Sequence, residues 1–374
     1  MTKQTESTRL KVTVAKTDFV RVLERCQGVA SPKTTMPILA NVKLETIGQR
    51  LNVSATDLYL AVIGSAGADF EAPGSVCLPA RDLLERVKFM PDGEITITTS
   101  DACVTTIRAK GSQRRYTLNG IPGEEFPSLP NSEGAKWITL PAFVLSNLFN
   151  RTAFAASVDD TRLNLNSVIF ELEGTRARCV SSDGHRLALA DESLSKPQSL
   201  VTMIPLKGVN ELRRLLPDEG DVRIAVLGAH LFAEIGDYSF SVKLTDAQPV
   251  PYAQVIPTDC KRTVTAPRVA LIEMIKAIQV ASSDRTGGVR LTLTNGMLKI
   301  DSESPDGGQG FDEMAVDYSG NDLIIGANGK YLIEALAATQ GDDVTIGTGD
   351  ELDPILIQPV GNGGTQMVAM PLRI

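Results

Sequence analysis

The order of hydrophobic and polar positions predicts short strands that alternate with helices along the whole chain. Residues 12–14 place apolar side chains at every second position, as in a half-buried strand. The apolar positions of residues 19–26 then recur at the spacing of one helix face, and Asp18 stands where it can cap that helix. Similar helical spacing follows Pro141 and Pro267, and proline suits a first helical turn because no hydrogen bond is lost there. The chain therefore begins the same strand–helix pattern three times.

This pattern is a repeat with an offset of about 126 residues. The segment 55–60 aligns with 181–186, which places Asp57 above Asp183 without any insertion. A weaker third copy lies at an offset of about 247 to 250 residues. Three copies of one module are the simplest account of the spacing, because each copy has the size of an ordinary domain.

Each copy contains a second helix, predicted over 80–90, 207–216 and 330–339. Each of these ends at a turn rich in glycine or aspartate, and a strand with two-residue alternation follows. Two helices laid on antiparallel sheet in each copy make an α+β fold of three tandem modules. The expected modules are 1–132, 133–260 and 261–374.

Length and composition are those of a multi-domain globular protein. The 374 residues exceed what one hydrophobic core usually serves, and the chain is 43% apolar and 22% charged. The polar start lacks the apolar core of a signal peptide, and no stretch is apolar enough to span a bilayer. We therefore expect a cytoplasmic protein without membrane contact. Five cysteines without a CxxC pair and only two histidines predict buried, reduced thiols and no metal site.

The net charge of −8 argues against a uniformly basic surface for nucleic acid. The six predicted helices nevertheless carry twelve basic residues against seven acidic ones, so the acidity resides in the rest of the chain. This distribution suggests electrostatic contact with a polyanion through the helices. Ordinary solvated helix faces would give the same tally, and charge alone favours that simpler interpretation.

Ser182, Asp183 and His185 lie within four residues, which raises the hypothesis of a hydrolase. Catalytic triads are assembled from distant segments, and such close neighbours do not normally reach relay geometry. Because Asp57 occupies the same place in the first copy, we interpret the aspartate as part of a structural turn. Residues 326–331 lack the spacing and the hydroxyl residue of a phosphate-binding loop. The sequence thus predicts no catalytic residue and no cofactor.

Three segments resemble a known family. Residues 35–41 (TMPILAN), 182–188 (SDGHRLA) and 368–374 (VAMPLRI) closely resemble the bacterial sliding clamp, the beta subunit of DNA polymerase III. The resemblance covers the whole chain, including its repeat. It implies a head-to-tail homodimer that closes into a ring, with helices lining a hole around double-stranded DNA and sheets outside. It also implies three kinds of protein partner: the replicative DNA polymerase, the clamp loader and other proteins with clamp-binding peptide motifs.

A ring of this kind needs no contact with bases, because attraction between basic side chains and phosphates is independent of sequence. We therefore expect DNA contacts from the helix layer and from the loop before Met36. The expected residues are Lys33, Arg81, Arg86, Arg151, Lys207, Arg213 and Arg214.

The resemblance places the partner site between the second and third modules, where short client peptides bind. Aliphatic side chains would hold the apolar anchors of the peptide, and arginine and backbone groups its polar end. The apolar C-terminal tail is expected to pack beside 185–187 as one wall. Where many clamps have Phe-Pro-Asp-Tyr, this chain reads PVPY at 249–252, so its pocket rim at 250–255 departs from the family pattern. The pocket residues carried over by motif are Arg162, Leu165, Ser182, Gly184, His185, Arg186, Leu187, Val255, Tyr331, Val368, Met370, Pro371, Leu372 and Arg373.

The dimer implied by the resemblance pairs an edge strand of the first module with one of the third. Residues 114–118 alternate as an edge strand would, and we expect apolar contact surrounded by opposite charges. The expected interface residues are Arg114, Arg115, Tyr116 and Leu118, facing Val280, Asp306, Asp312 and Glu313. Two alternatives stay open here: the hydrolase described above, and a repeat-built interaction scaffold that does not encircle DNA.

Overall fold

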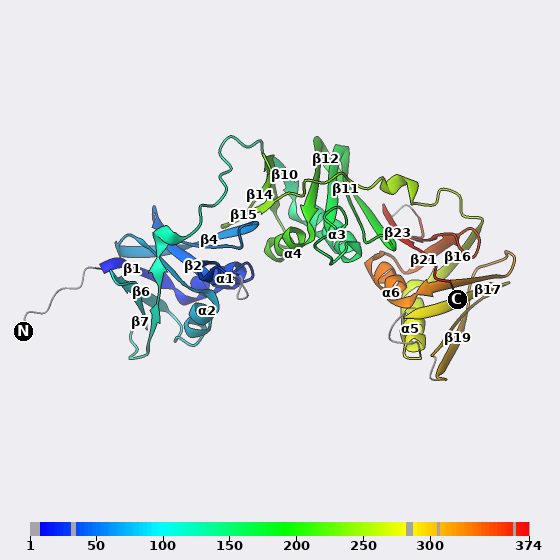
Figure 1. Ribbon diagram of the computed structural model, residues 1–374, viewed down its shortest axis with the longest axis horizontal. Coiled ribbons are helices and arrows are strands. Elements are labelled where there is room, and N and C mark those ends of the chain that lie inside the picture. Colours follow the sequence, from blue (N-terminus) through cyan, green and yellow to red (C-terminus); the bar gives the residue numbers. More distant parts are fainter. Residues whose placement is uncertain (1–7, 31–34, 282–286, 305–306, 362–363, 374) are drawn as a thin grey trace, which may run out of the picture. The chain divides into compact units, whose positions relative to one another are not determined.

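The computed structural model describes residues 8–30, 35–281, 287–304, 307–361 and 364–373. The chain forms two compact units, and each is described by itself (Figure 1). Unit 1 contains residues 1–143 and 210–244, and unit 2 contains residues 144–209 and 245–374. The second copy of the repeat is thus divided between the two units. Helices α3 (Ala142–Thr152) and α4 (Leu206–Leu215) contain the points of division.

Unit 1 combines two helices, two single-turn helices (η) and most of the shorter strands. Its elements are β1 (Thr8–Ala15), α1 (Lys16–Gln27), η1 (Pro37–Ala40), β2 (Asn41–Ile47), β3 (Arg50–Thr56), β4 (Leu60–Ala72), β5 (Ser75–Pro79), α2 (Ala80–Lys88), β6 (Glu94–Ser100), β7 (Val104–Ala109), β8 (Arg115–Asn119), β9 (Ile121–Pro122), η2 (Gly123–Glu125), β10 (Ile138–Pro141), β13 (Asp221–Leu227), β14 (His230–Ile235) and β15 (Tyr238–Lys243).

Unit 2 contains the two longest strands, which form one hairpin. Its elements are η3 (Ala153–Ala155), β11 (Ser167–Ser182), β12 (Arg186–Pro205), η4 (Tyr252–Gln254), β16 (Arg262–Pro267), α5 (Arg268–Gln279), β17 (Gly288–Thr294), β18 (Met297–Glu303), β19 (Gln309–Ala315), β20 (Leu323–Asn328), α6 (Gly329–Ala338), β21 (Asp343–Thr348), β22 (Ile355–Pro359) and β23 (Thr365–Ala369). The second helices α2, α4 and α6 lie within two residues of their predicted bounds.

The strands of unit 1 belong to one antiparallel sheet, whose main path runs β10-β13-β14-β15-β4-β1-β6-β7-β8. Strand β15 of the second copy pairs directly with β4 of the first, with Val242 opposite Leu60. Strand β8 stands at the end of this path and pairs only with β7 among the described strands. The sheet therefore continues across the boundary between the first two copies and ends at the edge predicted from residues 114–118.

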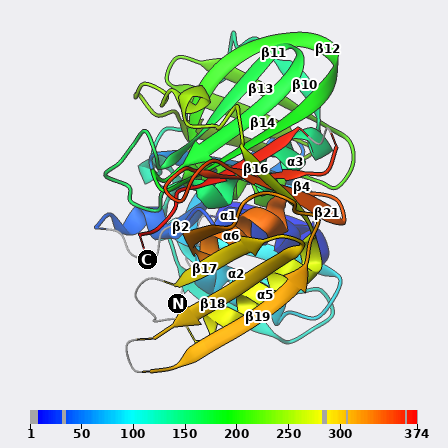
Figure 2. The same cartoon turned by 90° about the vertical axis from the view of Figure 1, so that its right-hand side faces the viewer.

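Unit 2 contains two antiparallel sheets, one of six strands in the order β11-β12-β23-β22-β21-β16 and one of four strands in the order β19-β18-β17-β20. Figure 2 shows β17, β18 and β19 side by side, with α5 and α6 behind them. In the larger sheet, β23 of the third copy pairs with β12 of the second, and Val368 lies opposite Leu187. The smaller sheet ends at β19, which pairs only with β18 among the described strands.

The helices are amphipathic and cover one face of the antiparallel sheet, as predicted. In α1, Phe19, Val22, Leu23 and Cys26 are buried, which are the positions that the helical spacing selected. Helix α1 packs against α2 and against β3 and β4, whereas α5 packs against α6 and the smaller sheet of unit 2. The predicted α+β fold with two helices on antiparallel sheet is confirmed. No helix in the described part of the chain is both long and apolar enough to cross a bilayer.

A small apolar cluster lies on the larger sheet of unit 2, apart from the core beneath α5 and α6. Ile169, Val180, Leu187, Leu189, Met203, Leu356 and Val368 form this outer cluster. Val250, Tyr252, Ile256 and Cys260 of the following segment pack over it. Segment 250–256 is therefore fixed against the sheet by apolar contact.

Two non-glycine residues in the described chain have a left-handed backbone, Leu58 with φ 76° and Cys103 with φ 59°. For residues other than glycine, this conformation costs roughly 1–2 kcal/mol. Cys103 is buried and packed, but the Leu58 side chain is 51% exposed. Packing of the Leu58 side chain therefore does not fully account for this backbone.

Candidate functional site

The turn between β11 and β12 is held by its own side chains. The Ser182 hydroxyl donates to the Arg186 carbonyl oxygen at 2.7 Å and accepts from the Gly184 N–H at 3.1 Å. Asp183 Oδ1 accepts from the N–H groups of His185 and Arg186 at 2.9 and 3.0 Å. These contacts use the serine and the aspartate to shape the turn, as the repeat predicted. They leave the exposed His185 side chain at its tip.

Two features favour glycine at position 184 of this turn. Its φ of 92° lies in the left-handed region, which favours glycine. A Cβ atom at this position would also lie 3.2 Å from Nη2 of Arg162 and 3.9 Å from Cδ1 of Leu165. The structure therefore brings Arg162 and Leu165 against the turn, as the motif comparison implied. Arg162 is exposed there, and Leu165 is buried.

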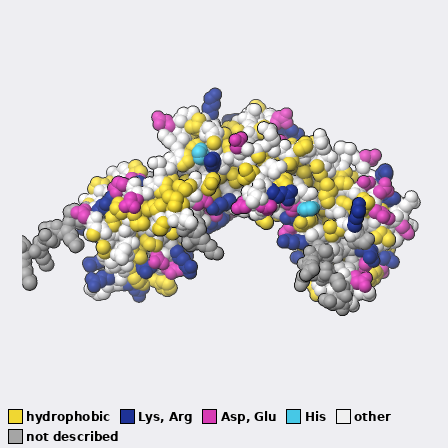
Figure 3. All heavy atoms as spheres, viewed as in Figure 1, with side chains coloured by type: hydrophobic (Ala, Val, Ile, Leu, Met, Phe, Trp, Pro, Cys, Tyr) yellow, Lys and Arg dark blue, Asp and Glu magenta, His cyan; other side chains and the backbone are white. Residues whose placement is uncertain are grey.

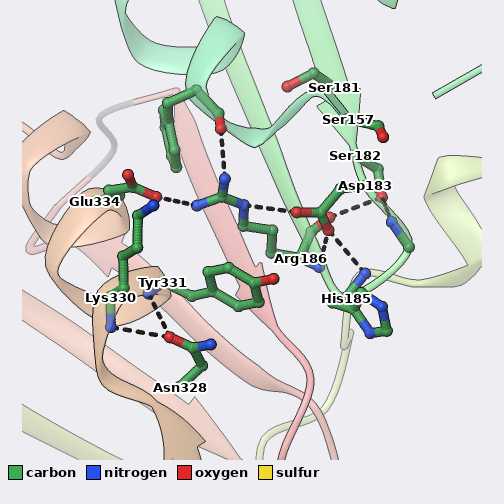
Figure 4. Close-up of polar contacts among 12 residues, drawn as sticks. Ser157, Ser181, Ser182, Asp183, His185, Arg186, Asn328, Lys330, Tyr331 and Glu334 are labelled. Atoms are coloured by element: carbon green, nitrogen blue, oxygen red, sulfur yellow. Dashed lines mark hydrogen bonds and ion pairs between the residues drawn. The ribbon is translucent and has the colours of Figure 1, made fainter. Parts of the chain in front are cut away.

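Arg186 holds the turn against helix α6, and its side chain is only 12% exposed. Figure 4 shows its guanidinium between Asp183 and Glu334, above the ring of Tyr331. Nε donates to Asp183 Oδ2 at 3.0 Å, Nη2 to the Phe154 carbonyl at 2.6 Å, and Nη1 to Glu334. The guanidinium carbon lies 4.4 Å from the Tyr331 ring centre, within cation–π distance.

These contacts change the role expected for Arg186. We expected an arginine to fix the polar end of a peptide, but the guanidinium of Arg186 already binds two carboxylates and a carbonyl within the chain. Arg186 therefore positions the turn and the Tyr331 ring. Of the predicted pocket arginines, Arg162 is exposed beside the turn, and Arg373 is exposed in the C-terminal segment.

The C-terminal segment lies beside this turn. Strand β23 pairs with β12, so that Ala369 is opposite Arg186. The Met370 N–H then donates to the His185 carbonyl at 2.9 Å, and the Leu372 N–H donates to the Gly326 carbonyl at 2.8 Å. The segment is tied by backbone hydrogen bonds on both sides, and Leu372 and Arg373 line an open hollow of about 520 Å³.

Segment 249–252, which departs from the family pattern, is anchored by hydrogen bonds of the Tyr252 hydroxyl. The Tyr252 hydroxyl donates to Glu171 at 2.8 Å, and Arg178 Nη1 donates to that hydroxyl at 3.4 Å. Arg178 also binds both carboxylate oxygens of Asp191 at 2.6 Å. Burial raises the pKa of the Tyr252 phenol, and the Asp191 hydrogen bonds raise the pKa of Arg178. Val255, which follows, is 37% exposed, and its N–H donates to the Tyr252 carbonyl at 3.0 Å.

The residues expected to contact DNA differ in how exposed they are. Arg81, Lys207, Arg213 and Arg214 are exposed on α2 and α4, and Arg86 is half-buried. Arg81 pairs with Glu85 at 3.0 Å and Arg214 with Glu211 at 2.9 Å, so each helix carries compensating acidic residues. On the face that Figure 3 shows, basic and acidic side chains are interspersed over both units. Lys33 lies outside the described residues.

The expectation that Arg151 contacts DNA is wrong. Its side chain is 8% exposed and is paired with Glu192, while Nη1 donates to the Thr365 hydroxyl at 3.4 Å. Arg151 lies at the end of α3 and faces β12, which the sequence spacing could not reveal. It holds together elements of unit 2.

We predict that Arg151→Met lowers the free energy of unfolding by about 3 kcal/mol, because Glu192 loses its buried cationic partner. The salt dependence of DNA binding should not change. Urea unfolding and binding titrations at several salt concentrations measure both quantities. The double variant Arg151→Met with Glu192→Leu should recover part of the stability. An unchanged stability together with a smaller salt slope would contradict this assignment.

The two strands expected at the dimer interface each end a sheet among the described strands. Arg114 and Arg115 are exposed at β8, and Asp312 and Glu313 are exposed on β19. Val280 is 87% exposed, and Phe311, which the sequence did not single out, is 61% exposed on β19. An exposed phenylalanine on an edge strand indicates an interface, and the apolar pattern of this strand in the sequence could have identified Phe311 as a candidate.

Leu118 does not belong to an exposed edge surface. It is 6% exposed and lies opposite buried Thr105, so its side chain faces the core of unit 1. The sequence predicted the two-residue period of the strand, but it did not predict which of the two faces of the strand is buried. Asp306 lies outside the described residues.

Comparison with known proteins covers nearly the whole chain. Three family models of the DNA polymerase III beta subunit match it: the N-terminal domain at residues 10–130, the central domain at 139–249 and the C-terminal domain at 253–373. The beta sliding clamp of Pseudomonas putida is 33% identical over 367 residues, which cover 97% of this chain and 99% of that protein. The Escherichia coli beta sliding clamp is 28% identical over 372 residues, 98% of this chain and 100% of that protein.

Solved structures agree with this relationship. A Pseudomonas aeruginosa sliding clamp bound to griselimycin has a TM-score of 0.92 and 30% identity, and the match covers 98% of this chain and 100% of that one. A Bacillus subtilis sliding clamp has a TM-score of 0.93 at 26% identity, again over 98% and 100% of the two chains. The repeat, the antiparallel modules and the full-length match lead to one conclusion. The chain belongs to the bacterial DNA sliding clamp family, the beta subunit of DNA polymerase III.

Proposed function

We propose that two copies of the chain join head to tail into a ring around double-stranded DNA and tether the replicative polymerase and other clients to it. The observation that carries the proposal is that β8 and β19 each end a sheet among the described strands, with exposed Arg114 and Arg115 at β8 and exposed carboxylates on β19. Opposite charges on two such edges support a heterologous contact, which closes when the rotation between copies permits. In this proposal each chain consists of modules 1–132, 133–260 and 261–374.

The ring retains DNA by closure and therefore needs only weak, sequence-independent contacts. Exposed basic residues of α2 and α4 would approach the phosphates, and neighbouring carboxylates such as Glu85 and Glu211 would keep each contact weak. Such contacts vary little along the duplex, so the ring can slide. The chain would work in the cytoplasm as a processivity factor, and the tethered polymerase would perform the catalysis.

Retention on DNA tests the closed ring. Loaded onto nicked circular DNA, the protein should remain bound during gel filtration in high salt, and it should be lost once the DNA is made linear. Equal loss from circular and linear DNA would overturn the proposal and favour a scaffold that does not encircle DNA.

We predict that Lys207→Glu combined with Arg213→Glu lowers the salt slope of linear-DNA binding by about two units, one for each lost phosphate contact. The measurement is binding anisotropy over a range of salt concentrations. Lys196→Glu with Arg176→Glu is the matched control, because these exposed residues lie on β12 and β11 rather than on a helix. An equal effect of the two pairs would show that only net charge matters.

We propose that client peptides bind the surface made by the turn at 182–187, Arg162, Tyr331, Val255 and the segment 368–373. The partly exposed Pro371 and Leu372, beside Leu187 and Val368, would take the apolar anchors, and Arg162 would attract a peptide carboxylate. Tyr252, fixed by Glu171 and Arg178, would keep the rim in place.

Deletion of residues 370–374 is expected to weaken client-peptide binding by about 1–3 kcal/mol, the scale of losing anchor contacts. Within the described part of the tail, the backbone hydrogen bonds that are lost come from Met370 and Leu372, so the protein should stay folded and able to encircle DNA. Calorimetric titration with a client peptide, beside the circular-DNA assay, checks both statements. Unchanged peptide affinity would place the site elsewhere.

A further inference from the structure

Unit 1 contains a turn with the same hydrogen bonds as the turn at 182–186. Thr56 Oγ1 donates to the Leu60 carbonyl at 2.8 Å and accepts from the Leu58 N–H at 3.0 Å, as Ser182 does in the second copy. Asp57 Oδ1 accepts from the N–H groups of Tyr59 and Leu60 at 3.0 and 2.7 Å, as Asp183 does. The repeat therefore builds this turn twice.

The strand beside the turn is also repeated. The Lys243 N–H donates to the Tyr59 carbonyl at 2.8 Å, and the Met370 N–H donates to the His185 carbonyl at 2.9 Å. In both places, the preceding residue of the neighbouring strand lies opposite the residue that ends the turn, Val242 opposite Leu60 in the first case. Lys243 thus occupies the position that Met370 occupies beside the proposed client surface.

The side chains at this second turn are exposed and largely apolar. Tyr59 is 67% exposed, and Leu58 projects from a left-handed backbone where the other copy has glycine. Lys243 Nζ lies 6.0 Å from the Tyr59 ring centre. In the adjoining strands, Lys243 lies opposite His230, and His230 lies opposite the exposed Leu227, so these side chains share one sheet face.

Lys243 supplies an exposed cation to this surface. Burial and the nearby Lys243 ammonium lower the pKa of His230, so the histidine is neutral at neutral pH and the lysine carries the charge. The Asp57 carboxylate accepts two backbone N–H groups within the turn. An apolar platform with one cation is complementary to a peptide that combines apolar side chains with a carboxylate.

We propose that Leu58, Tyr59, Leu227 and Lys243 form a second peptide-binding surface, which takes an acidic, apolar segment of a client protein. Leu58 and Tyr59 would contact its apolar side chains, and Lys243 its carboxylate. A binding role would explain why a half-exposed leucine occupies a backbone conformation that favours glycine. This inference rests on the proposed function, because it assumes that clients present such peptides.

The test uses the chain that lacks residues 370–374, in which the first surface is impaired. The probe is the blocked tripeptide Ac-Asp-(4-fluoro-Phe)-Leu-amide, followed by fluorine NMR line broadening during titration. We expect the truncated chain to bind the probe, and Leu58→Gly in the same chain to weaken binding at least fivefold. Leu58→Gly should leave the melting temperature equal or higher, because glycine relieves the left-handed backbone.

Lys243→Glu in the truncated chain should weaken binding of the aspartate probe at least fivefold. A second probe, with lysine in place of aspartate, should bind the unsubstituted truncated chain at least fivefold more weakly than the aspartate probe does. Phe89→Ala, which removes another exposed aromatic side chain of unit 1, should leave binding of the aspartate probe unchanged. Equal binding by the Leu58→Gly chain, or equal binding of the two probes, would overturn the second surface. So would probe binding to the full chain that vanishes on truncation, although the proposed function would then stand. Loss of retention on circular DNA would instead refute the proposed function.

Discussion

Reversing the charges of β19 with Asp312→Lys and Glu313→Lys is expected to dissociate the dimer and abolish its retention on circular DNA. In the proposed interface these residues face Arg115 of β8 and the preceding Arg114, so the variant brings four cations together at each contact. Like charges brought together across an interface cost several kcal/mol. We expect the dimer dissociation constant to rise at least a hundredfold, which corresponds to about 2.8 kcal/mol. Sedimentation velocity over a concentration series measures it.

Rescue by a second reversal makes this prediction specific. Arg114→Glu and Arg115→Glu, added to the same chain, restore opposite charges in both contacts of the ring and should restore the dimer. Asp218→Lys with Glu219→Lys is the matched control, because these residues are exposed in the turn after α4. Glu313 Oε2 lies 3.8 Å from Lys299 Nζ within the sheet, so the substitution removes an ion pair of the fold. The melting temperature of each variant therefore checks folding. A dimer that is insensitive to the first pair, or monomers that the second pair does not rescue, would contradict the proposed interface.

Replacing Arg186 by methionine is expected to lower the free energy of unfolding by about 3–5 kcal/mol, because it removes a buried cation shared by two carboxylates. The turn at 182–186 and the ring of Tyr331 would lose their common support, so we also expect client-peptide affinity to fall more than tenfold. Urea unfolding and calorimetric peptide titration measure the two effects.

Two further variants separate the charge of Arg186 from its geometry. Arg186→Lys should rescue little, since an ammonium cannot reach Asp183, Glu334 and the Phe154 carbonyl with one planar group. Arg186→Met with Glu334→Leu should recover part of the stability, because no carboxylate is then left without its partner, while peptide affinity stays low. Full activity of Arg186→Lys in peptide binding would refute the positioning role.

The sequence predicted those parts of the molecule that depend on local periodicity. The helices and the turn around Asp183 appear where expected, because helical spacing and repeated aspartates are local signals. The errors concern which face is buried. Arg151 meets Glu192, 41 positions away, and Leu118 turns toward the core of unit 1; a period alone does not determine such contacts.

Long-range pairing was the other part that the sequence could not provide. The pairing of β4 with β15 and of β12 with β23 depends on register between strands from different copies. The anchoring of Tyr252 by Glu171 and Arg178 likewise joins residues about 80 positions apart. Such contacts arise only when the sheets assemble, and they determine which side chains surround the candidate site.

The continuous sheet of unit 1 has a mechanical consequence. From β10 to β8, each strand is paired with the next, including β15 with β4 where two copies meet, and both ladders of β1 contain a register shift. Tension along this path is borne by many hydrogen bonds that must break together, so unit 1 should behave as a stiff arm. In the proposed ring, opening by a clamp loader would then concentrate strain at the contacts between chains and would leave each arm elastically intact.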